Sequence, residues 1–340
     1  MRSIQILDCT LRDGGYCNNW IFGNKTICDT TINLIEAGVD YVEFGLLSNQ
    51  APFNEESTYY PSFSPMDNNR KKINARIRYD VSSKLLCMIN HNDFNLSELP
   101  DICNVPLGGI RYAFHRKDLY SIYDNIIQIN RKGFPIFLQP MQTSRYTSEE
   151  LSYLIRLSNE LKVFSVYIVD SFGSISINDL FHIVSMFDEL LIPDIKIGFH
   201  SHDNSLCAYS NTYSLINYNS KHNIIVDSCL AGIGRGAGNA KTEQLCSLIN
   251  ELYPNRYDLS IIQKTKDLVM NNLNPIHLWG WSPYFSLSAE YDSHPNYALY
   301  LQEHNVKLDI ARSFFASLHE EEKEQFDKTL VRSWIHLNNQ

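Results

Sequence analysis

Two polar segments far apart in the chain carry the side chains best suited to chemistry. Residues 7–15, LeuAspCysThrLeuArgAspGlyGly, change abruptly from apolar to polar and end on two glycines. HisSerHisAspAsn at 200–204 follows another apolar run. His200 and His202 have the spacing of side chains on one side of a strand. Two imidazoles and a carboxylate such as Asp13 suit Mn²⁺, Fe²⁺, Co²⁺ or Zn²⁺. We therefore predict a divalent-metal site built from both segments.

Each of these metal-site residues also has a plainer interpretation. A HisXHis pair alone is more often structural or solvent-facing, and Asp13 before glycine is a common turn former. The position of the histidines directly after the apolar run ProAspIleLysIleGlyPhe favours the metal interpretation.

Further charged residues stand where predicted strands end. Arg12, beside Asp13, is suited to stabilising an enolate or carboxylate oxygen. Glu43 lies inside the apolar segment TyrValGluPheGly, and a buried charge is costly unless it is paired. We expect Arg12 to be its partner. Asp170, in ValAspSerPheGly, is a candidate substrate ligand or a support for the site.

A glycine-rich loop, GlyIleGlyArgGlyAlaGlyAsnAlaLysThrGlu, occupies residues 232–243. Such a loop can hold phosphate or carboxylate at a helix N-terminus. It is not a P-loop, because Arg235 and Ala240 stand where that motif requires glycine. Asn239 is expected to reach the metal region, to cap the following helix, or both.

Eight short apolar segments alternate with amphipathic ones, which predicts a (β/α)8 TIM barrel. The predicted strands are 4–8, 40–45, 84–89, 109–113, 135–139, 164–169, 195–199 and 223–227. The predicted helices are 25–37, 66–79, 118–132, 147–160, 176–190, 204–218 and 241–252. We assign residues 1–254 to the barrel and 255–340 to a mostly helical C-terminal extension packed on it. Helices are expected at 258–273 and 319–328 in this extension.

Composition excludes several classes of protein. The chain has 340 residues, of which 44% are hydrophobic, and a net charge of −9. It has no basic cluster typical of nucleic-acid binding or of a polybasic membrane anchor. No signal-peptide core or membrane-spanning apolar run is visible. The eight cysteines are isolated and form no CxxC pair, so we expect a reduced, cytoplasmic protein.

Four motifs, in their order over about residues 1–255, resemble those of the DRE-TIM metallolyase superfamily. They are ThrLeuArgAspGly, ValGluPheGly, HisSerHisAspAsn and GlyIleGlyArgGlyAlaGlyAsnAla. This pyruvate carboxyltransferase-like group includes isopropylmalate and homocitrate synthases, 3-hydroxy-3-methylglutaryl-CoA (HMG-CoA) lyase and 4-hydroxy-2-oxovalerate aldolase. The resemblance implies a divalent metal, with Mn²⁺ favoured over Mg²⁺, Co²⁺ or Zn²⁺. It assigns the metal to Asp13, His200 and His202, with Asn239 close by. Arg12 would stabilise the enolate, and Glu43 would orient Arg12.

One position departs from the family pattern. Three residues after the metal aspartate, the oxovalerate aldolases have a catalytic histidine and the acyl-CoA condensing enzymes usually have glutamine, whereas this chain has Tyr16. Tyr16 is therefore our first candidate for moving the alcohol proton. ArgTyrAlaPheHis at 111–115 resembles the fourth strand of the aldolases, so we expect His115 to line the pocket. Tyr291 and His294 belong to a segment that either folds over the barrel mouth or packs against the barrel.

The sequence thus predicts a metal-dependent aldolase that joins or cleaves pyruvate, or a related 2-oxo acid, and an aldehyde. A Schiff-base enzyme is disfavoured, because Lys84 and Lys196 lie at strand starts. A Claisen-type synthase using acyl-CoA is an alternative, weakened by the missing glutamine and regulatory domain. A non-catalytic, partner-binding barrel is another, weakened by the intact Arg12 and Glu43. The resemblance also suggests a homodimer or a dehydrogenase partner bound through residues 255–340.

Overall fold

Parallel strands form a closed barrel in the computed structural model, which describes residues 3–77, 79–277 and 279–338. The barrel strands are β1 (Ile4–Asp8), β2 (Tyr41–Leu47), β4 (Leu85–Asn90), β5 (Gly109–Phe114), β6 (Ile136–Pro140), β7 (Ser165–Asp170), β8 (Lys196–Ser201) and β9 (Ile224–Ser228). Each pairs with its neighbours in this order, and β1 pairs with both β9 and β2, which closes the ring. The two-residue β3 (Tyr59–Tyr60) adds to the rim of β2. The predicted strands and TIM barrel are confirmed.

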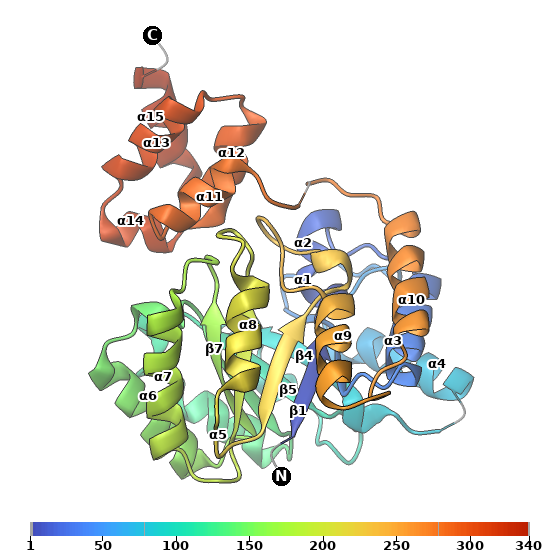
Figure 1. The fold of residues 1–340 in the computed structure, drawn as a ribbon. Coiled ribbons are helices and arrows are strands. Elements are labelled where there is room, and N and C mark those ends of the chain that lie inside the picture. Colours follow the sequence, from blue (N-terminus) through green and yellow to red (C-terminus); the bar gives the residue numbers. More distant parts are fainter. Residues whose placement is uncertain (1–2, 78, 278, 339–340) are drawn as a thin grey trace.

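Helices surround the barrel and cover its outer face (Figure 1). They are α3 (Asn24–Glu36), α4 (Phe63–Ile77), α5 (Tyr123–Arg131), α6 (Ser148–Leu161), α7 (Ile177–Leu190), α8 (Ala208–Asn217) and α9 (Thr242–Leu252), with the short α1 (Thr10–Asp13) and α2 (Gly15–Asn18) directly after β1. Local sequence explains their starts. Thr147 and Glu150 form a reciprocal capping box at the start of α6, for example.

The apolar core has two layers because the parallel strands are buried on both faces. Side chains such as Ile6, Ile110 and Ile197 pack outward against the helices. Phe137 and Tyr167 point into the barrel interior. Both layers hold the strand ends in fixed positions, which is what a site built from several strands requires.

The C-terminal part is helical, as predicted, but it divides into two parts. Helix α10 (Leu259–Asn272) packs against α3, and its Ile262 and Val269 belong to the barrel core, so this core continues past residue 254. The remaining helices share a separate core around Tyr297 and Phe314. They are α11 (Pro283–Glu290), α12 (Pro295–Glu303), α13 (Leu308–Ser317), α14 (Glu320–Glu324) and α15 (Lys328–Asn338).

The single helix predicted at 319–328 is wrong. The chain forms α14, leaves the helical conformation at Gln325, and starts α15 at Lys328. The physical reason is a cap, because the Asp327 side chain accepts hydrogen bonds from the backbone amides of Thr329 and Leu330.

Helices α11–α15 lie above the carboxyl ends of the strands (Figure 1). Arg145, which follows β6, joins the two parts. Its Nε lies 2.8 Å from Asp292 Oδ2, and its Nη1 lies 3.7 Å from Glu320 and 3.6 Å from Glu324. Gln142 Nε2 also donates to the backbone oxygen of Glu324 at 3.1 Å. These contacts fix the extension over the barrel mouth. No helix in the described part of the chain is both long and apolar enough to span a bilayer.

The close contact of Gly198 with Tyr167 predicts a sensitive position below the histidines of β8. A Cβ at Gly198 would lie 2.3 Å from the Tyr167 ring, so Gly198→Ala must displace the ring or the strand. We expect a loss of about 1–3 kcal/mol in the free energy of unfolding, measured by urea denaturation. In a Tyr167→Leu background the same change should cost less, because the ring is gone. Equal costs in both backgrounds would contradict this explanation.

Candidate active site

The three predicted metal ligands converge at the barrel mouth. Asp13 lies in α1, shortly after β1, His200 lies near the end of β8, and His202 directly follows that strand. One carboxylate oxygen and one ring nitrogen from each histidine lie within 4.8 Å of one another. His202 Nε2 is 4.0 Å from Asp13 Oδ2. All three side chains are buried, so the group forms a compact N₂O set that fits a divalent transition-metal ion.

Hydrogen bonds orient both imidazoles toward this set. His200 Nδ1 lies 2.9 Å from Asp227 Oδ2, and His202 Nδ1 lies 3.2 Å from the backbone oxygen of Arg235. Each Nδ1 then carries the proton and each Nε2 keeps its lone pair, the usual arrangement of metal-binding histidines. Burial lowers the pKa of His202 to about 3, which keeps the ring neutral and able to ligate.

The carboxylate of Asp13 is held in its charged form. Burial by itself would raise its pKa, but Arg12, His202 and His200 lower it well below its usual range. Asn239 Nδ2 donates to Asp13 Oδ2 at 2.6 Å. Asn239 Oδ1 is buried without a hydrogen-bond partner, so it is available as a further oxygen ligand. The residues therefore fit a metal ion, and the Asn239 amide lies against the Asp13 carboxylate.

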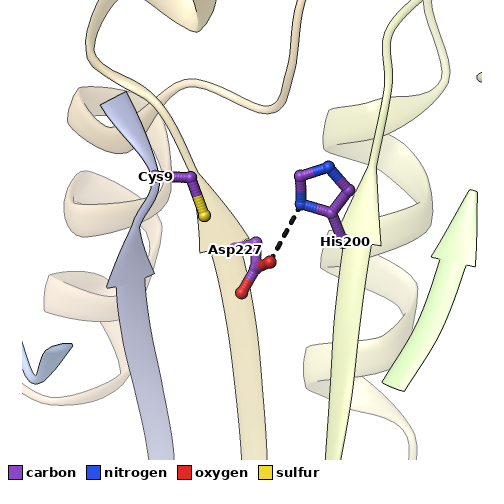
Figure 2. Close-up of side chains that lie close together, drawn as sticks. All are labelled: Cys9, His200 and Asp227. Atoms are coloured by element: carbon purple, nitrogen blue, oxygen red, sulfur yellow. Dashed lines mark hydrogen bonds and ion pairs between the residues drawn. The ribbon is translucent and has the colours of Figure 1, made fainter. Parts of the chain in front are cut away.

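A second group of possible ligands lies just below, where Cys9, His200 and Asp227 come within 4.8 Å of one another (Figure 2). Figure 2 shows the bond from Asp227 to the lower ring nitrogen of His200. Arg111 Nη1 donates to Cys9 Sγ at 3.0 Å and Arg111 Nη2 contacts Asp227. Burial also raises the pKa of the Cys9 thiol, which keeps it protonated. The Arg111 guanidinium thus occupies the position that a metal cation would need. Cys9 and Asp227 therefore support His200 instead of binding a metal with it.

Two arginines share the carboxylate of Glu43. Arg12 Nε lies 2.8 Å and Arg111 Nη1 2.9 Å from Glu43 Oε2. Arg12 Nη1 also contacts Asp13. These contacts hold the Arg12 guanidinium against the metal site, and the expected Arg12–Glu43 pair is present.

A cavity of about 80 Å³ opens beside these residues. Its lining includes Arg12, Asp13, Tyr16, His115, Gln139, His200, His202, Arg235 and His294. Tyr16 and His115 are therefore placed where the sequence predicts them. His294 comes from the loop before α12, so the extension contributes to the cavity wall. Burial lowers the pKa of His115 and of His294, so both rings are neutral.

Two predicted site residues lie elsewhere. Tyr291 stacks on Phe315 in the core of the extension, because its side chain turns away from the barrel mouth. The Oδ1 atom of Asp170 accepts from the backbone amides of Ser174 (2.9 Å) and Ile175 (3.2 Å), so Asp170 shapes the loop after β7. Neither residue lines the cavity.

Sequence reasoning missed the residues beneath the site. Arg111, Asp227 and Gln139 are charged or polar side chains inside apolar strands, and all three are buried. Arg111 Nη2 contacts both Gln139 Oε1, at 3.0 Å, and Asp227. The signal was the same as at Glu43, a charge within an otherwise apolar strand, in IleArgTyrAlaPhe and IleIleValAspSer.

Comparison with known proteins supports the family resemblance seen in the sequence. The HMGL-like family model matches residues 115–269, from the end of β5 through most of α10. The 4-hydroxy-2-oxovalerate aldolase of Bacillus cereus is 24% identical over 81% of this chain and 77% of its own length. The oxaloacetate decarboxylase of Mycobacterium tuberculosis is 23% identical over 72% of this chain and 69% of its own length. These matches support a place for the chain in the DRE-TIM metallolyase superfamily.

A solved structure extends the likeness beyond the barrel. The N-terminal domain of a proposed aldolase from Bacteroides vulgatus has a TM-score of 0.75 and 23% identity, covering 90% of this chain and 98% of that one. Its fold therefore matches that of this chain across most of the extension as well.

Arg111 pairs with both Glu43 and Asp227, so we expect its replacement to have a large effect on stability. Arg111→Met leaves the buried Asp227 and Glu43 carboxylates with one cation fewer. We expect a loss of about 3–5 kcal/mol in the free energy of unfolding, measured by urea denaturation. Arg312→Met, which removes an exposed ion pair with Glu290, is the control and should leave the transition midpoint unchanged. Similar midpoints for the two variants would contradict the role of Arg111.

The buried Asp170 predicts a pH dependence. Burial raises its pKa from 3.8 to about 7, against the opposing effect of its hydrogen bonds from backbone amides. A raised folded-state pKa favours folding at low pH, and this contribution is lost as the pH rises from about 4 to 7. Asp170→Asn keeps an oxygen for both amides but does not titrate. We expect the wild type to lose stability relative to this variant over that range in urea titrations at stepped pH. Parallel curves of stability against pH for the wild type and Asp170→Asn would contradict the raised pKa of Asp170.

Proposed function

We propose that the protein is a divalent-metal-dependent aldolase that forms and cleaves a C–C bond next to a 2-oxo acid, with pyruvate as the simplest candidate. The observation that carries the proposal is the convergence of Asp13, His200 and His202 beside the Arg12 guanidinium at one cavity. A site that merely stabilised the fold would need the ligands but not the oriented arginine. The curated relatives named as aldolases support the same chemistry.

Each side chain then has a defined task. A divalent ion held by Asp13, His200 and His202 would act as a Lewis acid on the 2-oxo carbonyl. Arg12 donates hydrogen bonds to the oxygen on which negative charge develops, with its Nη2 still free of any acceptor in the described residues. Glu43 fixes the plane of the guanidinium, so this donor is in place before the reaction starts.

Tyr16 is the proposed proton donor and acceptor at the alcohol of the second substrate. Its side chain lines the cavity together with Arg12 and Asp13. A phenol hydroxyl can both donate and accept, as aldol cleavage in the two directions requires. His115 and His294 line the same cavity and are the alternatives.

Decarboxylation of a 2-oxo acid with a carboxylate on its third carbon is a second candidate. The specific observation is the oxaloacetate decarboxylase among the relatives. Both reactions break a bond to the carbon next to the 2-oxo group and leave negative charge on the same oxygen, so Arg12 would serve both.

For the metal we propose Mn²⁺, since two imidazoles and a carboxylate suit this ion as well as Co²⁺ or Zn²⁺. We also propose a reducing, cytoplasmic setting, because all eight cysteines are free thiols. The homodimer and the dehydrogenase partner at the extension stay predictions.

Deuterium exchange at the pyruvate methyl group tests the proposal directly. Metal-stripped protein in D₂O should show no exchange by NMR, and added Mn²⁺, Co²⁺, Mg²⁺ or Zn²⁺ should restore it once paramagnetic ions are removed before detection. Arg12→Ala should lower the rate by about 100- to 1,000-fold, the usual effect of removing such a donor. His200→Ala should abolish the metal-dependent exchange.

Arg131→Ala is the matched control, because Arg131 is exposed at the end of α5. Its exchange rate should equal that of the wild type. Exchange that needs no metal, or that survives Arg12→Ala at full rate, would contradict the proposed function.

A further inference from the structure

We propose that Arg235 selects an acceptor aldehyde that carries an anionic group, either a carboxylate or a phosphate. This inference rests on the proposed function and concerns the second substrate, which that function leaves open. It starts from the position of Arg235 in the glycine-rich loop between β9 and α9.

Arg235 lies between two cavities. It lines the metal-site cavity, and it also lines a second cavity of about 240 Å³ between the barrel and the extension. Tyr16 is likewise part of both walls. Residues of the extension, among them Phe285, Asn296 and Leu299, also line the second cavity. The two cavities therefore share Arg235 and Tyr16, and a substrate that occupied both would contact these residues.

The guanidinium of Arg235 has no acidic partner anywhere in the described residues, where it makes no side-chain hydrogen bond or ion pair. Its carbon Cζ instead lies 4.0 Å from the centre of the Tyr16 ring. A contact with the ring face engages the π surface of the guanidinium and leaves its N–H edges free. These edges form the planar donor pair that binds carboxylate or phosphate with two parallel hydrogen bonds.

The surroundings do not neutralise this charge. Asp13 is the single acid in the lining of the metal-site cavity, and Arg12 and Asn239 already bind its oxygens. No acidic side chain is found among the residues that line the second cavity. A half-buried cation without a counter-ion is unfavourable, and an anionic ligand would remove this cost.

The acceptor, and not the 2-oxo acid, fits this position. Arg12 and the metal ligands already provide charge-complementary groups for the 2-oxo acid. Arg235 also lines the second cavity, which offers the free space that a second substrate needs. In the aldol step the pyruvate methyl group loses a proton, its carbon bonds to the aldehyde carbon, and the aldehyde oxygen takes up a proton. The anionic tail of the aldehyde takes no part in this, so Arg235 would affect its binding and orientation.

Matched pairs of acceptors test the inference in the metal-loaded full-length protein. Succinic semialdehyde is compared with butanal, and glyceraldehyde 3-phosphate with glyceraldehyde, each added to pyruvate. We expect the wild type to prefer the anionic member of at least one pair by 10-fold or more in kcat/KM. The pair that shows the preference tells carboxylate from phosphate recognition.

Arg235→Ala should reduce that preference by about 10- to 100-fold, the usual effect of losing a hydrogen bond to a charged group. Arg235→Lys should retain part of it, because the charge remains without the planar donor pair. The ratio within one variant is the readout, so a general change in folding or metal content cancels. Arg131→Ala, which removes an exposed arginine, should leave the ratio as in the wild type.

Three results would overturn the inference. These are equal kcat/KM values for the charged and neutral acceptors, a preference that persists in Arg235→Ala, or a raised KM for pyruvate in that variant with the ratio intact. Pyruvate exchange without any acceptor separates the two proposals. Exchange without acceptor preference would remove this inference alone, whereas absence of exchange with every metal would remove the proposed function and this inference with it.

Discussion

The arrangement of the site depends on one buried charge, the guanidinium of Arg111 in the barrel interior. It binds Glu43, which holds Arg12, and it binds Asp227, which orients His200. A cation in a nearly dry interior is stable only when its partners satisfy it, and each partner is thereby fixed in place. The groups proposed for charge stabilisation and for metal binding are thus linked through a side chain that has no contact with solvent.

The barrel was predictable because strand and helix periodicity are local properties. Every predicted barrel strand is present to within two residues, and the proposed metal ligands meet where strand ends of a closed barrel must meet. Glu43 was also predictable, since a charge in an apolar strand demands a partner. Arg111 carries the same local signal, but its partners on β2, β6 and β9 are defined only once the ring is closed.

The extension was less predictable, for a different physical reason. Tyr291 and His294 stand three residues apart in one aromatic-rich segment, and nothing local distinguishes them. Only docking through Arg145 turns His294 into the cavity and leaves Tyr291 in the helical core. The break before α15 depends similarly on one capping residue, Asp327. It lies within a charged run that is otherwise typical of a single helix.

The origin of the second cavity has a consequence for how such enzymes diverge. All the groups assigned to enolate chemistry come from the barrel, whereas Phe285, Asn296 and Leu299 come from helices with a core of their own. Substitutions in those helices can reshape the outer space without disturbing the interior that supports the metal ligands. Catalytic power and substrate choice can therefore evolve at separate rates, with the loop that carries Arg235 as the boundary between them.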